Sequence, residues 1–220
     1  MLEGPSAGAH APVDQGTVVK IALVDFGAGN LTSVVKGLAA VGADVALVNT
    51  VEAARTADAL VIPGVGHFSA LASLGSDWRT FASDAISRGV PLLGICLGMQ
   101  WLFEGSAEAP DVPGLGLIPG SCFRIEGNVK VPHVGWNGLA LSPRPSRLLE
   151  GIEPESSAYF THSYAAPVVA DTVATTTHGM PFSSAVERDR VFGVQFHPEK
   201  SGGTGLRILS NFVRAASEAR

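Results

Sequence analysis

A short apolar run that ends in a cysteine between two glycines constrains the fold of this chain more than any other stretch. Residues 90–95 are apolar without alternation, which indicates a short strand buried on both faces. After Cys96, the apolar residues Met99, Leu102 and Phe103 recur at helical spacing. The stretch therefore predicts a strand, a tight turn and a helix, with the thiol at the turn.

The residues around Cys96 are suited to a nucleophile. Gly94 and Gly98 allow a sharp turn and a close approach of substrate, and a thiol at a helix N-terminus is favoured as the reactive thiolate. The pattern resembles the G-x-S-x-G nucleophile elbow with Cys in place of Ser. Gln100 would share a helix face with Cys96. The alternative is that Cys96 is a small buried side chain, as most free cysteines are.

Strands and helices alternate through the first half of the chain. Strands are expected at residues 18–26, 43–49, 59–62 and 90–95, and helices at residues 31–41, 50–57 and 78–88. Asn30 is expected to cap the first of these helices. Short connections between such elements predict a doubly wound, mostly parallel α/β sheet. Ligands bind such sheets at the carboxyl ends of the strands, and the third strand ends in the glycine-rich turn at residues 63–66.

The second half has a different pattern. Residues 104–115 predict a loop in which Glu104 and Glu108 are solvated charges. Five strands without crossover helices between them are expected here, at residues 117–125, 129–134, 158–164, 172–177 and 182–187. Strands without crossover helices indicate antiparallel pairs, which we expect to pack on the first sheet. A strand at 190–196 and an amphipathic helix at 205–216 close the chain. Residues 18–220 are thus expected to form one domain. Residues 1–17 are rich in Gly, Ala, Pro and Ser, and we expect them to form a flexible extension.

The composition of the 220-residue chain argues against several classes of protein. A formal net charge of -5 gives no basic surface for nucleic acid, and no apolar run is long enough to span a membrane. Two cysteines, Cys96 and Cys122, make no disulfide framework and favour a reducing, cytoplasmic compartment. The histidines lack metal-ligand spacing, and the glycines at residues 27–29 lack the rest of a dinucleotide fingerprint, so neither a metal nor a cofactor is predicted.

A histidine and a carboxylate near the end of the chain form a second candidate catalytic element. Pro198 favours an extended conformation at His197, so Glu199 points the same way as the imidazole. The carboxylate would orient the ring and stabilise its charged form, and His197 would act as general base toward Cys96 and general acid toward a leaving amine. A strand-end histidine with a solvated glutamate is the alternative, and the cysteine at an elbow in the same chain favours catalysis.

The turn at residues 63–66 is the third element. Its two glycines form either a plain tight loop or a turn that directs a backbone N–H at a developing oxyanion. The backbone N–H of Leu97 would be the second donor. The sequence leaves open which amide of the turn points inward.

Together the three elements resemble the class I (triad) glutamine amidotransferases, over residues 18 to the end of the chain. The elbow G-x-C-x-G-x-Q stands at residues 94–100 and the H-P-E signature at residues 197–199. Within that family, four segments are similar to the glutaminase subunits of imidazole glycerol phosphate synthase. They are D-F-G-A-G-N at residues 25–30, P-G-V-G at 63–66, P-H-V-G-W-N at 132–137 and H-P-E-K-S-G at 197–202.

The resemblance implies a flavodoxin-like fold and hydrolysis of the side-chain amide of glutamine by a triad of Cys96, His197 and Glu199, without a cofactor or metal. The residues that it implies for the remaining roles are Val65, Gly66 and Leu97 as oxyanion donors, and Gly64, Gln100, His162, Ser163 and Tyr164 as contacts of glutamine.

The resemblance also implies a partner. Ammonia would pass to a (β/α)₈-barrel cyclase, HisF, which forms imidazole glycerol phosphate and aminoimidazole carboxamide ribotide in histidine biosynthesis. Asn30, Trp136 and Lys200 are predicted to lie near this partner, although Trp136 could instead pack in the core. Two alternatives stay open: an amidotransferase subunit of another synthase, and a non-catalytic binding subunit that has kept the fold.

Overall fold

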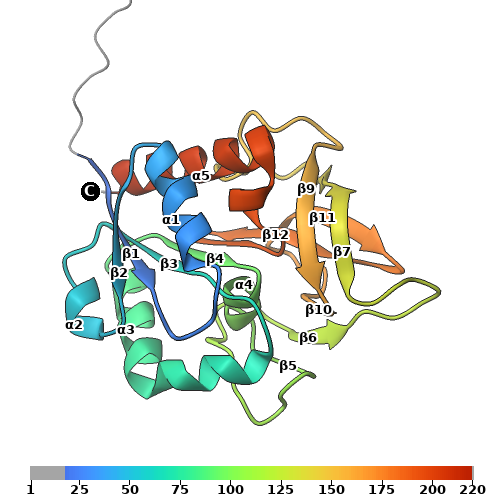
Figure 1. The fold of residues 1–220 in the computed structure, drawn as a ribbon, viewed down its shortest axis with the longest axis horizontal. Helices are drawn as coiled ribbons and strands as arrows, with labels where there is room; N and C mark the ends of the chain where they lie inside the picture. Colours follow the sequence, from blue (N-terminus) through green and yellow to red (C-terminus); the bar gives the residue numbers. More distant parts are fainter. Residues whose placement is uncertain (1–17, 220) are drawn as a thin grey trace, which may run out of the picture.

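Eight strands form the central sheet, in the order β2-β1-β3-β4-β13-β12-β11-β8 (Figure 1). The computed structural model describes residues 18–219, and the extension predicted at residues 1–17 lies outside this part. Five neighbouring strands are parallel, which confirms the predicted doubly wound α/β fold. They are β2 (Asp44–Val48), β1 (Lys20–Val24), β3 (Ala59–Ile62), β4 (Leu92–Ile95) and β13 (Val191–Val194).

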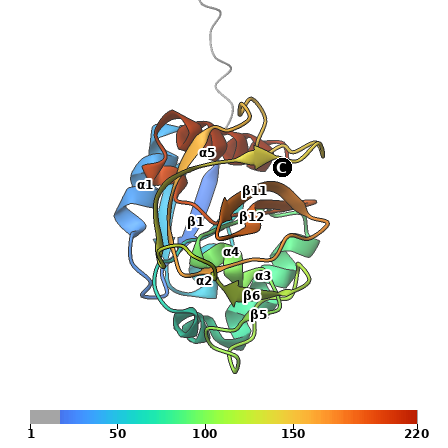
Figure 2. The same cartoon turned by 90° about the vertical axis from the view of Figure 1, so that its right-hand side faces the viewer.

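Helices cover both faces of this sheet. Helices α1 (Leu31–Ala40) and α5 (Gly202–Ser217) lie together over one face, and α2 (Val51–Ala54) and α3 (Gly75–Ser87) cover the other (Figures 1 and 2). Because strand residues alternate between faces, Leu23 of β1 packs in the core under α1 and α5, whereas Val24 packs in the core under α3. Burial on both faces explains why β1, β3, β4 and β13 are apolar without alternation, whereas β2, at the edge of the sheet, is largely exposed.

Three strands continue the central sheet in antiparallel pairing beyond β13: β12 (Met180–Arg188), β11 (Thr172–His178) and β8 (Ala140–Leu141). The predicted antiparallel region is present, but these strands extend the first sheet instead of packing on it. The reason is that β13 pairs in parallel with β4 on one edge and antiparallel with β12 on the other, so it joins the two halves.

Two smaller sheets lie at the antiparallel end of the molecule. One contains β10 (Tyr164–Ala165), β6 (Ser121–Arg124) and β5 (Gly105–Ser106), and the other pairs β7 (His133–Gly138) with β9 (Ser157–His162) (Figure 1). The strand expected at residues 129–134 was misplaced, because β7 begins only after Pro132, which has no N–H to donate to a ladder. Strand β7 therefore carries Trp136, which lies outside every strand that the sequence predicts.

The remaining helices are short and lie next to strand ends. Helix α4 (Leu97–Trp101) follows β4 directly, and the 3-10 helices are η1 (Phe68–Leu74) and η2 (Pro198–Lys200). Helix α3 begins at Gly75, three residues before its expected start. None of the helices in residues 18–219 is long and apolar enough to cross a membrane.

The two glycines that flank Cys96 are required because backbones meet there. A Cβ atom on Gly98 would lie 1.8 Å from the carbonyl oxygen of Ile62, at the end of β3. A Cβ atom on Gly94 would lie 2.4 Å from the carbonyl oxygen of Gly98. Strands β3 and β4 and helix α4 thus pack backbone against backbone around the turn that holds the thiol.

We expect Gly98→Ala to lower the free energy of unfolding by about 3 kcal/mol, because the new methyl group overlaps a backbone oxygen that cannot move without displacing β3. Urea denaturation measures the change. Gly203→Ala in α5 is the matched control: its Cβ meets no atom within 4 Å, so the stability should stay the same or rise slightly. Equal stabilities for the two variants would contradict the proposed packing.

Candidate active site

Cys96 sits at the junction of β4 and α4 in a strained conformation. Its φ is 53° and its ψ is -106°, a region of backbone conformation that residues other than glycine rarely occupy. Its backbone N–H donates to the carbonyl oxygen of Val194 at 2.7 Å, and its own carbonyl accepts from the backbone N–H of Gln100. The surrounding sheet and helix hold this conformation, which is the geometry of a nucleophile elbow.

His197 and Glu199 form a buried pair on the neighbouring strand end. The backbone N–H of His197, just after β13, donates to the carbonyl oxygen of Tyr159 at 2.8 Å. Its ring atom Nδ1 lies 2.8 Å from Oε1 of Glu199, and the two side chains are 1% and 0% exposed. A carboxylate accepts from Nδ1–H, so this contact leaves Nε2 as the ring atom available for catalysis.

The pKa of His197 is raised to about 9. Burial alone would lower this pKa, but interactions with Cys96 and with the carboxylate of Glu199 outweigh burial. Within the described residues Nε2 makes no hydrogen bond, although Cys96 is the group that raises the pKa most. The arrangement favours an imidazolium at His197, next to the Cys96 side chain.

Asn30 contacts this pair from the N-cap position of α1. The predicted position is therefore confirmed, but its φ of 75° is left-handed and its side chain makes no hydrogen bond to the start of the helix. The amide Nδ2 instead donates to Oε1 of Glu199, the same oxygen that accepts from His197. Asn30 thus orients the carboxylate that orients the imidazole, a role that its position in a turn did not reveal.

A cavity of about 290 Å³ opens beside the thiol. Its lining residues are Gly66, His67, Cys96, Leu97, Gln100, Glu108, Pro132, Thr161, His162, Ser163 and Tyr164. They come from turns and strand ends that are far apart in the sequence, as expected for a site at the carboxyl edge of a parallel sheet. The cavity brings together most residues predicted to contact glutamine.

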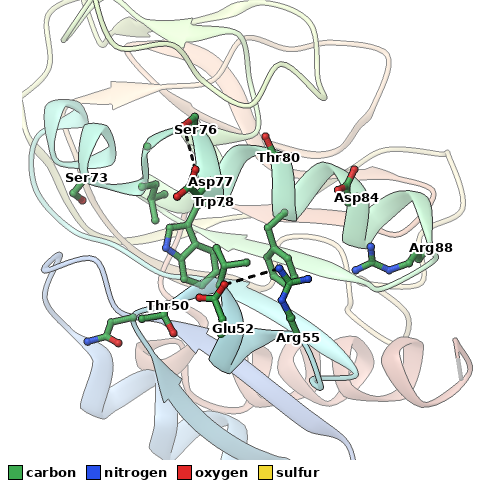
Figure 3. Close-up of a pocket in the computed structure, with 15 residues that line it drawn as sticks. Thr50, Glu52, Arg55, Ser73, Ser76, Asp77, Trp78, Thr80, Asp84 and Arg88 are labelled. Atoms are coloured by element: carbon green, nitrogen blue, oxygen red, sulfur yellow. Dashed lines mark hydrogen bonds and ion pairs between the residues drawn. The ribbon is translucent and has the colours of Figure 1, made fainter.

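A larger cavity of about 670 Å³ lies between α2 and α3 and shares no lining residue with the cavity beside the thiol (Figure 3). None of the predicted site residues lines it. Two pairs of its polar side chains contact each other: Glu52 forms an ion pair with Arg55, and Ser76 donates a hydrogen bond to Asp77. Size alone therefore does not identify the functional pocket.

Two of the three predicted oxyanion donors, Gly66 and Leu97, line the cavity with Cys96, whereas Val65 does not, and the N–H of Leu97 is engaged. The backbone N–H of Leu97 donates to the carbonyl oxygen of Gly64 at 3.3 Å. Gly66 has a φ of 115° and lines the cavity next to Cys96. In this conformation the Leu97 donor is therefore not free to bind an oxyanion, and the turn at residues 63–66 is the element that occupies it.

The side chain of Gln100 is buried and already hydrogen-bonded at one end of the cavity. Its Nε2 donates to the carbonyl oxygen of Tyr164 at 2.9 Å and to Oε1 of Gln195 at 3.1 Å. Gln100 therefore ties α4 to the cavity wall formed by residues 162–164. Gln195 was not among the predicted site residues, since a glutamine inside an apolar strand pattern carries no local signal of its own.

His162 belongs to a chain of hydrogen bonds that starts in β7. Its Nδ1 donates to the carbonyl oxygen of Tyr164 at 2.8 Å, so Nε2 is an acceptor, and Nδ1 of His133 lies 3.0 Å from it. The amide of Asn137 in turn donates to Nε2 of His133 at 3.3 Å. Burial, together with nearby imidazoles, lowers the pKa of His133 to about 4 and that of His162 to about 3, so both rings are neutral at pH 7.

Glu108 is not the solvated loop charge that the sequence indicated. Its carboxylate lines the cavity and accepts a hydrogen bond of 2.8 Å from the backbone N–H of Phe68, at the start of η1. The carboxylate can bind there because free N–H groups and the positive end of a helical turn face it. The loop pattern of residues 104–115 does not predict that this segment folds back onto the site.

Trp136 lies on the surface, so the alternative that it packs in the core is wrong. It is 58% exposed, and Val134, two residues away on the same strand face, is 57% exposed. The edge of the Trp136 ring meets Tyr159, and Nζ of Lys200 lies 5.9 Å from the centre of the Tyr159 ring. These side chains form an exposed patch outside the cavity. Within residues 18–219, no cluster of His, Cys, Asp or Glu could hold a metal ion.

Comparisons with known proteins agree with this geometry. Residues 22–216 match the family model for glutamine amidotransferase class-I, and the chain therefore belongs to that family. It is 50% identical over 202 residues to the imidazole glycerol phosphate synthase subunit HisH of Halobacterium salinarum, covering 88% of this chain and 92% of that protein. HisH of Methanothermobacter thermautotrophicus is 47% identical over 195 residues, with 88% and 97% covered.

Solved structures share the fold at low identity. A putative GMP synthase protein from Thermoplasma acidophilum has a TM-score of 0.70 and 20% identity, covering 91% of this chain and 95% of its own. The structure of PurLQS from Thermotoga maritima has a TM-score of 0.71 and 17% identity, with 90% and 99% covered. These two matches show the shared architecture alone.

We expect the neutral histidines to make the protein sensitive to acid. The folded-state pKa values of His133 and His162 lie below the ordinary value of 6.5, so the stability that they contribute is complete above pH 6.5 and is lost as the pH falls toward 4 and then 3. His133→Phe removes one of these groups and keeps a ring to stack on Phe160. Its free energy of unfolding should fall less steeply between pH 6.5 and 4 than that of the wild type, in urea titrations at each pH. Parallel slopes would contradict the assignment.

Proposed function

We propose that this chain is the glutaminase subunit of an imidazole glycerol phosphate synthase in histidine biosynthesis, and that Cys96, His197 and Glu199 are its catalytic residues. The observation that supports it most is the strained thiol at the edge of a cavity, next to a buried imidazole–carboxylate pair. Identities of 47–50% to HisH subunits over 88% of the chain favour this assignment within the family.

In the proposed reaction the Cys96 thiolate attacks the carboxamide carbon of glutamine and the C–N bond breaks. His197, held as an imidazolium by its raised pKa, gives a proton to the departing ammonia. The product is a γ-glutamyl thioester. Water, deprotonated by the now neutral His197, then cleaves the C–S bond, and glutamate leaves. Glu199 keeps the ring oriented and stabilises its charge throughout.

The negative oxygen formed in each step needs N–H donors, which we assign to Leu97 together with Val65 or Gly66. The bond from the Leu97 N–H to the Gly64 carbonyl opposes this assignment in the observed conformation. Residues 63–66 would therefore have to reorient before catalysis. A partner that binds the reoriented state more tightly would raise activity by shifting the population, which is consistent with a glutaminase that is weak until its cyclase partner binds.

The substrate would enter the cavity with its amide at Cys96 and its amino-acid end among Gln100, Glu108 and residues 162–164. Glu108 supplies the acidic group that an α-ammonium needs, and its hydrogen bond to the Phe68 N–H fixes the carboxylate at the cavity wall.

We expect Glu108→Gln to raise KM for glutamine about tenfold or more, with a smaller change in kcat, because it removes the charge that pairs with the α-ammonium of substrate. Steady-state glutamate release measures both constants. Glu104→Gln, in the same loop but outside the cavity lining, is the control and should leave KM unchanged. Equal effects of the two substitutions would contradict a role of Glu108 in substrate binding.

The partner proposed for the exposed patch is the HisF cyclase. Trp136 and Val134 are exposed apolar side chains, and Lys200, which follows Glu199, lies over the neighbouring Tyr159 ring. Tryptophan is a residue type enriched at interface centres, so Trp136 is the proposed anchor of this interface. Asn30, which the sequence predicts to lie near the partner, would instead act on the triad through its hydrogen bond to Glu199. Ammonia released at Cys96 would have a short path to a cyclase docked over this patch. An amidotransferase that serves another synthase is the alternative function, and the 17–20% identity of the GMP synthase and PurLQS structures gives it less support.

The test is release of glutamate from glutamine by the purified chain, alone and with HisF and its nucleotide substrate. We expect low activity alone, a strong rise in the complex, and loss of activity by a factor of at least about 10³ in Cys96→Ala. Cys122→Ala is the matched control. Cys122 is buried outside the cavity, and burial raises the pKa of its thiol, so its loss should leave activity intact.

The other outcomes identify the alternatives. Full activity without a partner would point to a free-standing glutaminase or to another synthase. No activity under either condition would point to a binding subunit that has kept the fold.

A further inference from the structure

Gln195 is a buried polar residue that the mechanism above does not use. It follows β13 directly, two residues before His197, and is 0% exposed. Its backbone N–H donates to the carbonyl oxygen of Ser184 at 2.9 Å, so the strand pairing fixes its position. Its side chain lies between the thiol and Gln100: Nε2 is 3.6 Å from Sγ of Cys96, and Oε1 is 3.1 Å from Nε2 of Gln100.

The orientation of this amide follows from its neighbours. The carbonyl oxygen of Tyr164 can only accept, so the atom of Gln100 that faces it must be the donor Nε2. That same nitrogen faces Gln195, which must therefore present its acceptor, Oε1. The N–H group of Gln195 is left pointing at Cys96, and no flip of either amide preserves all three contacts.

We propose that Gln195 is a catalytic hydrogen-bond donor to the sulfur of Cys96, stabilising its thiolate before attack and again when the thioester breaks. A donor inside a buried site stabilises a neighbouring anion far more than it does in water, because no solvent competes for the anion. A neutral thiol gains much less from the same contact. The N–H of Gln195 therefore shifts the equilibrium toward the reactive form.

The second part of this role rests on the proposed glutaminase function. When water cleaves the γ-glutamyl thioester, the electron pair of the C–S bond moves to Sγ, which leaves as a thiolate. The same N–H is in place to receive that charge. No group other than the substrate, water and the residues of the site is needed for the step to balance.

The thiol also has a competing contact and several titratable neighbours. The carbonyl oxygen of Thr161 lies 4.0 Å from Sγ and accepts from the neutral S–H, so it favours the opposite protonation state. The titratable groups that face the thiol or share its cavity are His197 with Glu199 after β13, His162 on β9, Tyr164 on β10, and His67 and Glu108 in the loops. All of them stay in place in the variants below, so a change in pH dependence reports on Gln195.

The test is the rate of alkylation of Cys96 by iodoacetamide as a function of pH, in chains that carry Cys122→Ala so that a single thiol reacts. Gln195→Met keeps a side chain of similar length and removes the donor. We expect the midpoint of the rate profile to move up by about one to two pH units, the equivalent of a hydrogen bond to a charged group. At a pH below both midpoints, this shift is a tenfold to hundredfold loss of rate.

Ser184→Ala is the control for disturbed packing. It lies on the paired strand, and within the described residues its hydroxyl has no hydrogen-bond partner, so the midpoint should not move. An unchanged midpoint in a folded Gln195→Met variant would overturn the proposal. Alkylation needs no glutamine and no cyclase, so its outcome is separate from success or failure of the glutaminase assay.

A second measurement covers the case in which Gln195→Met does not fold. In the wild-type chain with ¹⁵N-labelled glutamine side chains, the amide protons of Gln195 should shift as Cys96 loses its proton, and Cys96→Ser should abolish the shift. Gln195 amide protons that do not respond to the pH at which Cys96 titrates would overturn the proposal as well.

Discussion

The close approach of three backbone segments around Gly94 and Gly98 is the constraint on which the rest of the structure depends. Because neither residue has a side chain, the end of β3 reaches the start of α4, and α4 reaches back over β4. Between β4 and α4 the chain has room for only a sharp turn. This turn gives Cys96 a positive φ and places its thiol at the carboxyl edge of the sheet. The strain at this residue is balanced by backbone hydrogen bonds on both sides.

From the thiol, two sets of contacts lead outward through the protein. One passes through His197 and Glu199 to Asn30, which links the proposed triad to the start of α1. The other passes through Gln195 and Gln100 to the carbonyl of Tyr164, and from there through His162 and His133 to Asn137 on β7. The second set ends on the strand that carries Trp136, so the proposed partner face and the thiol share one hydrogen-bonded structure. Buried polar networks of this kind specify a single arrangement because each unpaired member would cost free energy.

The sequence predicted the parts of the site that have strong local patterns, and it missed those that depend on tertiary contacts. Continuous apolar runs and flanking glycines located the parallel strands and the elbow at Cys96, since burial and turn geometry act on neighbouring residues. The missing capping bond of Asn30 and the wrong solvation of Glu108 have one cause: each side chain bonds a segment far away in the chain. Gln195 was missed because its two partners come from the elbow and α4, and the antiparallel strands were misplaced because pairing partners are not encoded locally.

The most direct test of the central claim, that Cys96 is the nucleophile of a glutamine-specific site, is mass spectrometry after reaction with 6-diazo-5-oxo-L-norleucine, a glutamine analogue that alkylates such nucleophiles. We expect a single adduct on the peptide that contains Cys96, and we expect excess glutamine to suppress its formation. Cys122, buried and with a raised thiol pKa, should stay unmodified. A chain that forms no adduct in the presence of the proposed HisF partner, or that forms one on Cys122, would contradict the assignment of Cys96 as the nucleophile.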